Sequence, residues 1–210
     1  NQENPLFEMH DIIAGTIQEL SLKTENQQYL EEMISSVLEE SFPKGVTKRH
    51  MIRTSSTVDE NLQVILRNAE KYNINILKNL ELRLELLGTS TNIGDYETSK
   101  DMIKWFNDKE ENKEFHLDKM NNHQKYVYAL YLDLIGCYNN YALSNPVKAI
   151  EYFTRAKKIA STVDGYEYMK FNVNYQLFRT LLDLGQIEDA QKTLKEASDI
   201  YEKGIQGNNI

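Results

Sequence analysis

The residues best suited to chemistry in this chain are its histidines and its single cysteine. They are His10, His50, His116, His123 and Cys137. These residues share no metal-ligand spacing, and His-Glu-x-x-His does not occur. His116 and His123 lie seven residues apart, but the charged stretch before His123 favours surface positions for both. Cys137 stands in an apolar segment and is interpreted as a packed thiol. The sequence therefore predicts no catalytic residue, no metal and no cofactor.

The sequence contains no phosphate-binding loop motif. Gly-x-x-x-x-Gly-Lys-Ser/Thr is absent, so these 210 residues are not expected to hydrolyse ATP alone. The formal net charge of -8 argues against binding a nucleic-acid backbone. One cluster is locally basic and is interpreted as part of a solvated linker: Lys44, Lys48, Arg49 and Arg53. No nucleic-acid partner is expected.

Nearly every segment of the chain carries helical periodicity, and only 3 Pro and 9 Gly interrupt it. The N-terminal helices are expected over residues 9–20, 30–38 and 58–69. The later ones are expected over 76–88, 95–106, 123–141, 146–163, 166–184 and 187–203, with a charged hinge at 107–119. No apolar run reaches the roughly 20 residues that span a bilayer. With one cysteine and no signal peptide, the sequence predicts a cytoplasmic protein without a membrane partner.

A small-large-small pattern occurs twice near the C-terminus. The first copy is Ala149, Phe153 and Ala156, and the second, 41 residues later, is Ala190, Leu194 and Ala197. Small side chains let two helix backbones approach, while Phe153 or Leu194 fills the gap between turns. The pattern predicts helices that lie close against a partner helix.

A turn stands before each second helix of the predicted hairpins. Gly185 precedes Ala190, and Gly94 precedes Ser99, which lies 50 residues before Ala149. In the hairpin of Gly94 and Ser99, Phe106 replaces the expected small residue, so that hairpin is expected to be splayed. The three hairpins, over residues 76–203, resemble tetratricopeptide (TPR) repeats. The resemblance implies an all-α fold of antiparallel hairpins stacked as an α-solenoid, although the spacings of 50 and 41 exceed the family's 34. An irregular helical array is the alternative.

The same resemblance implies a ligand groove on the first helix of each hairpin. The expected exposed positions are Asp133, Cys137, Asn140 and Tyr141 in one hairpin and Asn172, Tyr175, Arg179 and Asp183 in the next. Asn140 and Asn172 would hydrogen-bond a peptide main chain, and Arg179 would clamp a carboxylate. Carboxylate-clamp TPR domains are similar, but their lysines are not evident here. Ordinary hydrogen bonding between helices is the alternative for each of these residues.

A second resemblance lies near the N-terminus. Phe7-Glu8-Met9-His10-Asp11-Ile12-Ile13 resembles the Met-His-Asp motif of STAND or NB-ARC signalling NTPases. In that family the histidine reaches the β-phosphate of bound ADP, and a TPR array follows in many bacterial members. The resemblance implies a nucleotide-sensing role for His10 and Asp11 in a longer protein, with the NTPase upstream of Asn1. The alternative is that Asp11 is a first-turn dipole partner and His10 a surface residue.

These observations predict an all-α protein in three parts. They are an N-terminal helical segment at 1–42, a linker and helix at 43–75, and a TPR-like repeat array at 76–210. The expected function is protein or peptide binding as the sensor or scaffold region of a STAND-type NTPase. A free-standing TPR regulator of a short signalling peptide is the runner-up, and a helical hydrolase is the enzyme alternative. Homo-oligomerisation stays open.

Overall fold

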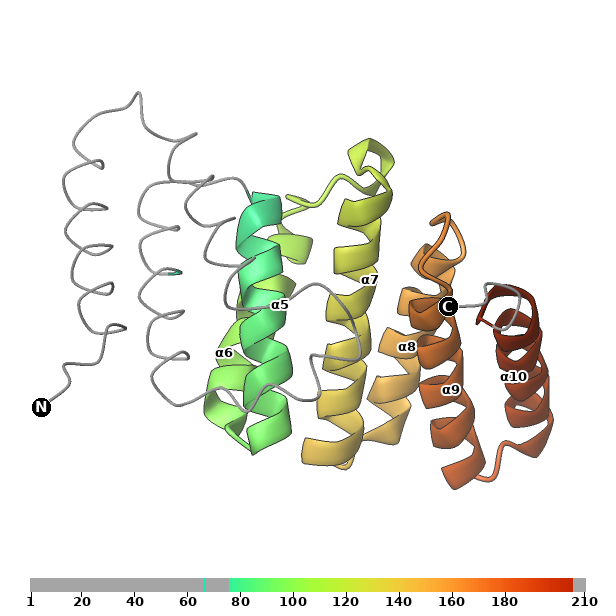
Figure 1. Cartoon of the computed structure of the whole chain (residues 1–210). Coiled ribbons are helices and arrows are strands. Elements are labelled where there is room, and N and C mark those ends of the chain that lie inside the picture. Colours follow the sequence, from blue (N-terminus) through green and yellow to red (C-terminus); the bar gives the residue numbers. More distant parts are fainter. Residues whose placement is uncertain (1–65, 67–75, 206–210) are drawn as a thin grey trace, which may run out of the picture. The chain divides into compact units, whose positions relative to one another are not determined.

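The described part of the chain, Leu66 and residues 76–205 of a computed structural model, is helical and contains no strand (Figure 1). The all-α prediction is therefore confirmed for these residues. The α-helices are α5 (Ile76–Ile93), α6 (Tyr96–Glu111), α7 (Asn122–Cys137), α8 (Pro146–Ala160), α9 (Glu167–Asp183) and α10 (Ile187–Ile200). Shorter turns are η2 (Leu117–Lys119), η3 (Tyr138–Ala142) and η4 (Tyr201–Ile205). None of the described helices is long and apolar enough to cross a membrane.

The chain divides into two compact units, residues 1–86 and 87–210. In the first unit the structure describes Leu66 and the N-terminal part of α5, where leucines such as Leu80 and Leu82 are buried. The helices predicted over 9–20 and 30–38 lie outside the described residues, as do the linker and most of the helix over 58–69. The second unit holds the C-terminal part of α5, the helices α6 to α10 and the candidate site.

Three turns with left-handed backbone lie in the second unit, each between two consecutive helices. Gly94, Ser144 and Gly185 have φ angles of 80°, 51° and 72°. They stand 50 and 41 residues apart, the spacing that the small residues of the following helices predict. Glycine adopts this conformation without a Cβ penalty, which suits two of the three reversals. Asp95 and Asn145 then cap α6 and α8 by accepting hydrogen bonds from the N–H groups of the third helical residue.

The small-large-small pattern of α8 is buried as the sequence predicts. Ala149, Phe153 and Ala156 are each 0% exposed. The Phe153 ring lies against the backbone of Gly136 on α7. A side chain at position 136 would clash with this ring. Phe153 also belongs to one apolar cluster with Leu177 and Leu181 of α9. Burying such a side chain contributes about 2–3 kcal/mol, so this cluster holds α7, α8 and α9 together.

Two large residues of the repeat pattern behave differently. Leu194 is 41% exposed, so the expectation that it fills a gap between helices is wrong; it points away from the α8–α9–α10 core. Phe106 is 0% exposed and stacks on Tyr131 of α7, with ring centroids 4.6 Å apart. The Tyr131 hydroxyl donates to the Met102 carbonyl at 2.8 Å. Phe106 therefore occupies an aromatic interface between α6 and α7.

Helix boundaries differ from the predictions where local hydrogen bonds extend or distort a helix. The predicted charged hinge begins later, because α6 continues to Glu111 and Lys109 then pairs with Glu114 at 3.0 Å. The helix predicted over 123–141 ends as the π-turn η3, which accommodates one extra residue per turn. There Asn139 donates its amide to the Ile135 carbonyl at 2.8 Å.

Candidate functional site

The predicted groove residues lie on α7, on the η3 turn that follows it and on α9, and several of them meet across the contact between these elements; we call this surface the α7–α9 face. At its centre the Asn172 amide donates to Asp133 Oδ2 at 3.0 Å. Asp133 is only 3% exposed, so the expectation that it stands exposed in a groove is wrong. The neighbouring helix α9 covers it and uses Asn172 to satisfy one carboxyl oxygen. Here the alternative of hydrogen bonding between helices describes the contact.

Burial changes the acid–base behaviour of this carboxyl group. Removal from water raises the pKa of Asp133 to about 7, and the hydrogen bond from Asn172 only partly opposes the shift. The second oxygen, Oδ1, is buried without a hydrogen-bond partner. An uncharged carboxylic acid loses less on burial than a carboxylate. Asp133 is therefore a titratable group whose charge changes near neutral pH.

Two further contacts join α9 to η3, the turn that follows α7. The Asn140 amide donates to Thr180 Oγ1 at 3.4 Å, and the Tyr141 hydroxyl donates to Gln176 Oε1 at 2.9 Å. Asn140 is half-buried, whereas Tyr141 is 51% exposed. Sequence reasoning missed Gln176, whose signal was its position one turn before Arg179 on the same face of the helix.

Arg179 supplies the positive charge on the exposed part of this face. Its guanidinium lies 5.9 Å from the centre of the Tyr175 ring, within cation–π range. Burial raises the pKa of Tyr141, while the Arg179 charge acts to lower it, so Arg179 also lies near that phenol. Of the eight predicted groove positions, Cys137, Asn140 and Asn172 are half-buried and Asp133 is buried, whereas Asp183, Tyr141, Tyr175 and Arg179 are exposed. Tyr141, Tyr175 and Arg179 form a polar and aromatic surface suited to hydrogen bonding and to pairing with an anion.

Cys137 stands beside this surface as a half-buried residue. Burial raises the pKa of its thiol well above the ordinary value, and the Asp133 charge adds to the shift. A thiol with a raised pKa is mostly protonated at neutral pH and reacts slowly. This agrees with the interpretation of Cys137 as a packed thiol.

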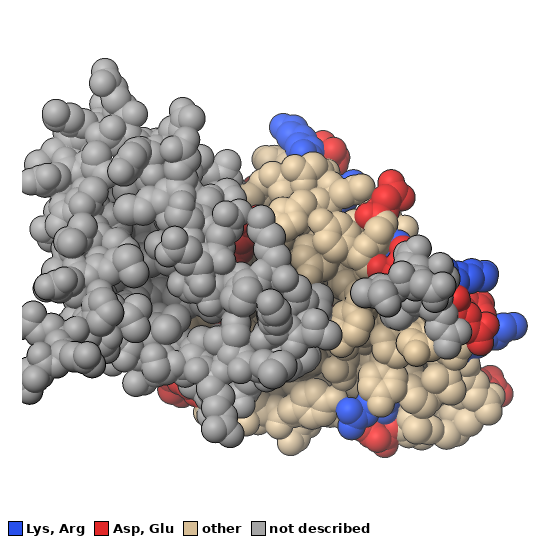
Figure 2. All heavy atoms as spheres, in the orientation of Figure 1, with Lys and Arg blue, Asp and Glu red and all other residues tan. Residues whose placement is uncertain are grey.

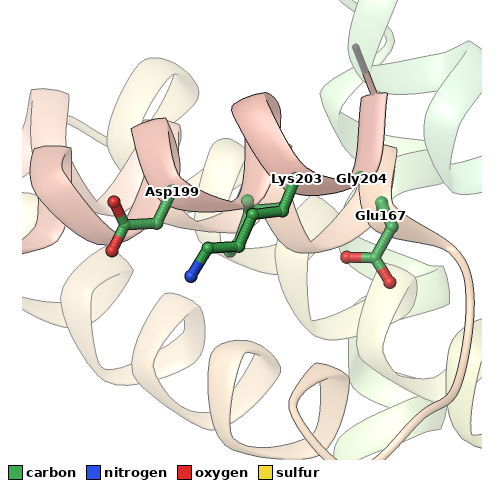
Figure 3. Close-up of a pocket in the computed structure, with 5 residues that line it drawn as sticks. Glu167, Asp199, Lys203 and Gly204 are labelled. Atoms are coloured by element: carbon green, nitrogen blue, oxygen red, sulfur yellow. The ribbon is translucent and has the colours of Figure 1, made fainter. Parts of the chain in front are cut away.

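A pocket of about 450 Å³ lies where α9 begins and α10 ends (Figure 3). Glu167, Asp199, Ile200, Lys203 and Gly204 line it. Glu167 also pairs with Lys170 at 2.8 Å. The lining contains neither the histidine nor the cysteine that the hydrolase alternative requires beside a carboxylate.

Other predicted site residues fall outside these contacts. His10 and Asp11 lie outside the described residues. His116 and His123 are exposed, and the described residues contain no group of three His, Cys, Asp or Glu side chains placed to hold a metal ion. Comparisons with protein-family models, curated proteins and solved structures give no significant match. The physical features of the α7–α9 face therefore carry the functional argument.

Proposed function

We propose that this chain is a protein-binding module, and that the exposed part of the α7–α9 face contacts the partner. The observation that carries the proposal is the grouping of Tyr141, Tyr175 and Arg179 at the surface of two packed hairpins. Tyrosine and arginine are the residue types that dominate binding energy at protein interfaces. Arg179 would pair with a carboxylate of the partner, and the tyrosine rings would supply apolar contact.

The proposal includes stacking of the hairpins as a TPR-like solenoid. Ion pairs between the second helices of successive hairpins support it: Arg155 of α8 pairs with Glu110 of α6, and Lys157 of α8 pairs with Glu196 of α10. Successive second helices lie side by side in a solenoid, and the first helices then line the other surface. The α7–α9 face belongs to the first helices.

A charge reversal tests the binding face. Immobilised wild type, Arg179→Glu and the control Lys158→Glu would be compared for the proteins they retain, measured by quantitative mass spectrometry. Lys158 is exposed on α8, so the control makes the same charge change away from the α7–α9 face. We expect a partner that wild type and Lys158→Glu retain and Arg179→Glu loses, and its purified form to bind at least about tenfold more weakly to Arg179→Glu. Equal retention by all three proteins would refute this face.

More narrowly, we propose that the module is the sensor or scaffold region of a STAND-type NTPase. The support is the Phe7–Ile13 resemblance and its position ahead of the hairpins. A free-standing regulator that binds a short peptide is the alternative. The reading frame upstream of Asn1 separates them, because a P-loop there supports the NTPase and its absence supports the regulator.

A further inference from the structure

Beside the buried side of α10, and at the first residue of η4, stands a row of large apolar side chains that are exposed. Ile187, Leu194 and Tyr201 stand seven residues apart, close to one line along the helix, and are 49%, 41% and 41% exposed. The opposite flank of α10 carries Glu196, which pairs with Lys157 of α8. The apolar row therefore faces away from α8, and Figure 1 draws α10 beyond α9 at the end of the described helices.

This row continues onto α9 through a chain of aromatic rings. The Tyr201 ring lies 5.7 Å from Phe171, which stacks on Tyr175 at 6.0 Å, and Tyr175 lies 6.2 Å from Phe178. We call Ile187, Leu194, Tyr201, Phe171, Tyr175 and Phe178 the end face. In the view of Figure 2, residues other than Lys, Arg, Asp and Glu cover much of the described surface, and these four charged types lie mainly toward its edges. A contiguous apolar surface of this kind marks an interaction site.

The preceding hairpin shows what covers the equivalent positions. Phe153 stands 41 residues before Leu194, and Ala160 stands 41 residues before Tyr201. Phe153 and Ala160 are 0% and 2% exposed, and Phe153 packs with Leu177 and Leu181 of α9. An amphipathic helix therefore covers this side of α8. The same kind of helix fits the corresponding side of α10.

Charged residues beside the row define the helix that fits. Glu188, Lys195 and Glu202 are exposed and also stand seven residues apart. In an antiparallel second copy, Lys195 would face Lys195 and Glu188 would face Glu202, so like charges would repel. A helix with basic, acidic and basic residues at the same spacing would place opposite charges against all three. We propose that the end face binds an amphipathic helix of another protein with this charge order. The end face shares Tyr175 with the α7–α9 face, but Leu194 belongs to the end face alone, so a change at Leu194 tests it separately from Arg179.

A designed peptide tests the proposal with the full chain. The probe is a fluorescent helical peptide of about 18 residues, with leucines spaced as Leu177 and Leu181 over its length and a Lys–Glu–Lys row at seven-residue spacing. Fluorescence anisotropy would measure its affinity for wild type, Leu194→Asp and Leu143→Asp. Leu143 is 54% exposed but lies outside the end face, so it provides a matched control.

We expect saturable binding that Leu194→Asp weakens at least about tenfold, because a charge would replace a contacting leucine. Leu143→Asp should bind as wild type does, and a Glu–Lys–Glu peptide should bind wild type at least about threefold more weakly. Absence of saturable binding, or equal loss with both aspartate variants, would overturn the proposal. Self-association of wild type that Leu194→Asp abolishes in sedimentation analysis would overturn it in favour of a second copy.

Discussion

Gly136→Ala tests the close packing between α7 and α8, the two helices of the middle hairpin. A Cβ at position 136 would lie 2.5, 2.7 and 3.0 Å from Cε1, Cδ1 and Cζ of Phe153. Real Cβ atoms do not approach carbon this closely, so either the ring or α7 must shift. Phe153 is 0% exposed, so its ring cannot move into solvent without displacing its neighbours. Overpacking of this kind costs about 1–3 kcal/mol, and three close contacts place this site near the upper value.

Alanine also favours the helical conformation more than glycine does, and the test must separate this gain in stability from the clash. Replacing a helical glycine by alanine contributes about 1 kcal/mol of stability. Gly88 provides the matched control, because a Cβ there would meet only Leu134 Cδ1 at an ordinary 3.5 Å. We therefore expect Gly88→Ala to stabilise by about 0.5–1 kcal/mol and Gly136→Ala to destabilise by about 2 kcal/mol.

Urea unfolding at equilibrium, followed by circular dichroism, measures this difference. With a slope of about 2 kcal/mol per molar urea, Gly136→Ala should lower the midpoint by about 1 M. In a Phe153→Leu background the same change should cost less, because the shorter side chain leaves room, and a double-mutant cycle measures that coupling. If Gly136→Ala is as stable as wild type, or gains stability as Gly88→Ala does, the close approach is refuted.

Three further outcomes follow from burial. Since the folded-state pKa of Asp133 is raised from 3.8 to about 7, its stabilising contribution is complete below pH 4 and is lost as pH rises through 7. Asp133→Asn should therefore gain about 3 kcal/mol relative to wild type between pH 5 and pH 8 in urea titrations, and a constant difference would contradict this. Phe153→Ala should cost about 3–5 kcal/mol by thermal or urea unfolding, while the repeat-equivalent Leu194→Ala should cost less than about 1 kcal/mol; similar losses would show that both are buried. Cys137 should react with Ellman's reagent at least about tenfold more slowly in the native protein than in urea at pH 8, and equal rates would exclude a buried thiol.

Much of the packing of the two C-terminal hairpins, α7–α8 and α9–α10, was predictable from residue type and spacing. Ala149, Phe153 and Ala190 are buried as predicted, since a helix that approaches another closely needs small residues one turn apart. The turn at Gly185 was also predictable, because glycine tolerates positive φ. Leu194 was not, since its sequence pattern matches that of Phe153. Its exposure depends on whether another helix covers it, which local spacing does not encode.

The candidate site was predictable in position but not in burial. Spacing placed Asp133 and Asn172 in one groove on successive first helices, with hydrogen bonding between the helices as the alternative, and the two side chains do meet. Aspartate is rarely buried, so exposure was the natural expectation. The burial of Asp133 depends on a contact 39 residues away in sequence. The π-turn after Cys137 likewise adds one residue that helical periodicity does not reveal.

We propose that successive hairpins pack with their second helices side by side, and a zero-length crosslink tests this packing most directly. A carbodiimide joins amines to carboxylates only in direct contact, and mass spectrometry identifies the joined peptides. We predict a Lys157–Glu196 crosslink between α8 and α10, together with local Lys148–Glu151 and Lys170–Glu167 crosslinks. The local crosslinks without the Lys157–Glu196 crosslink would contradict the stacking of the hairpins.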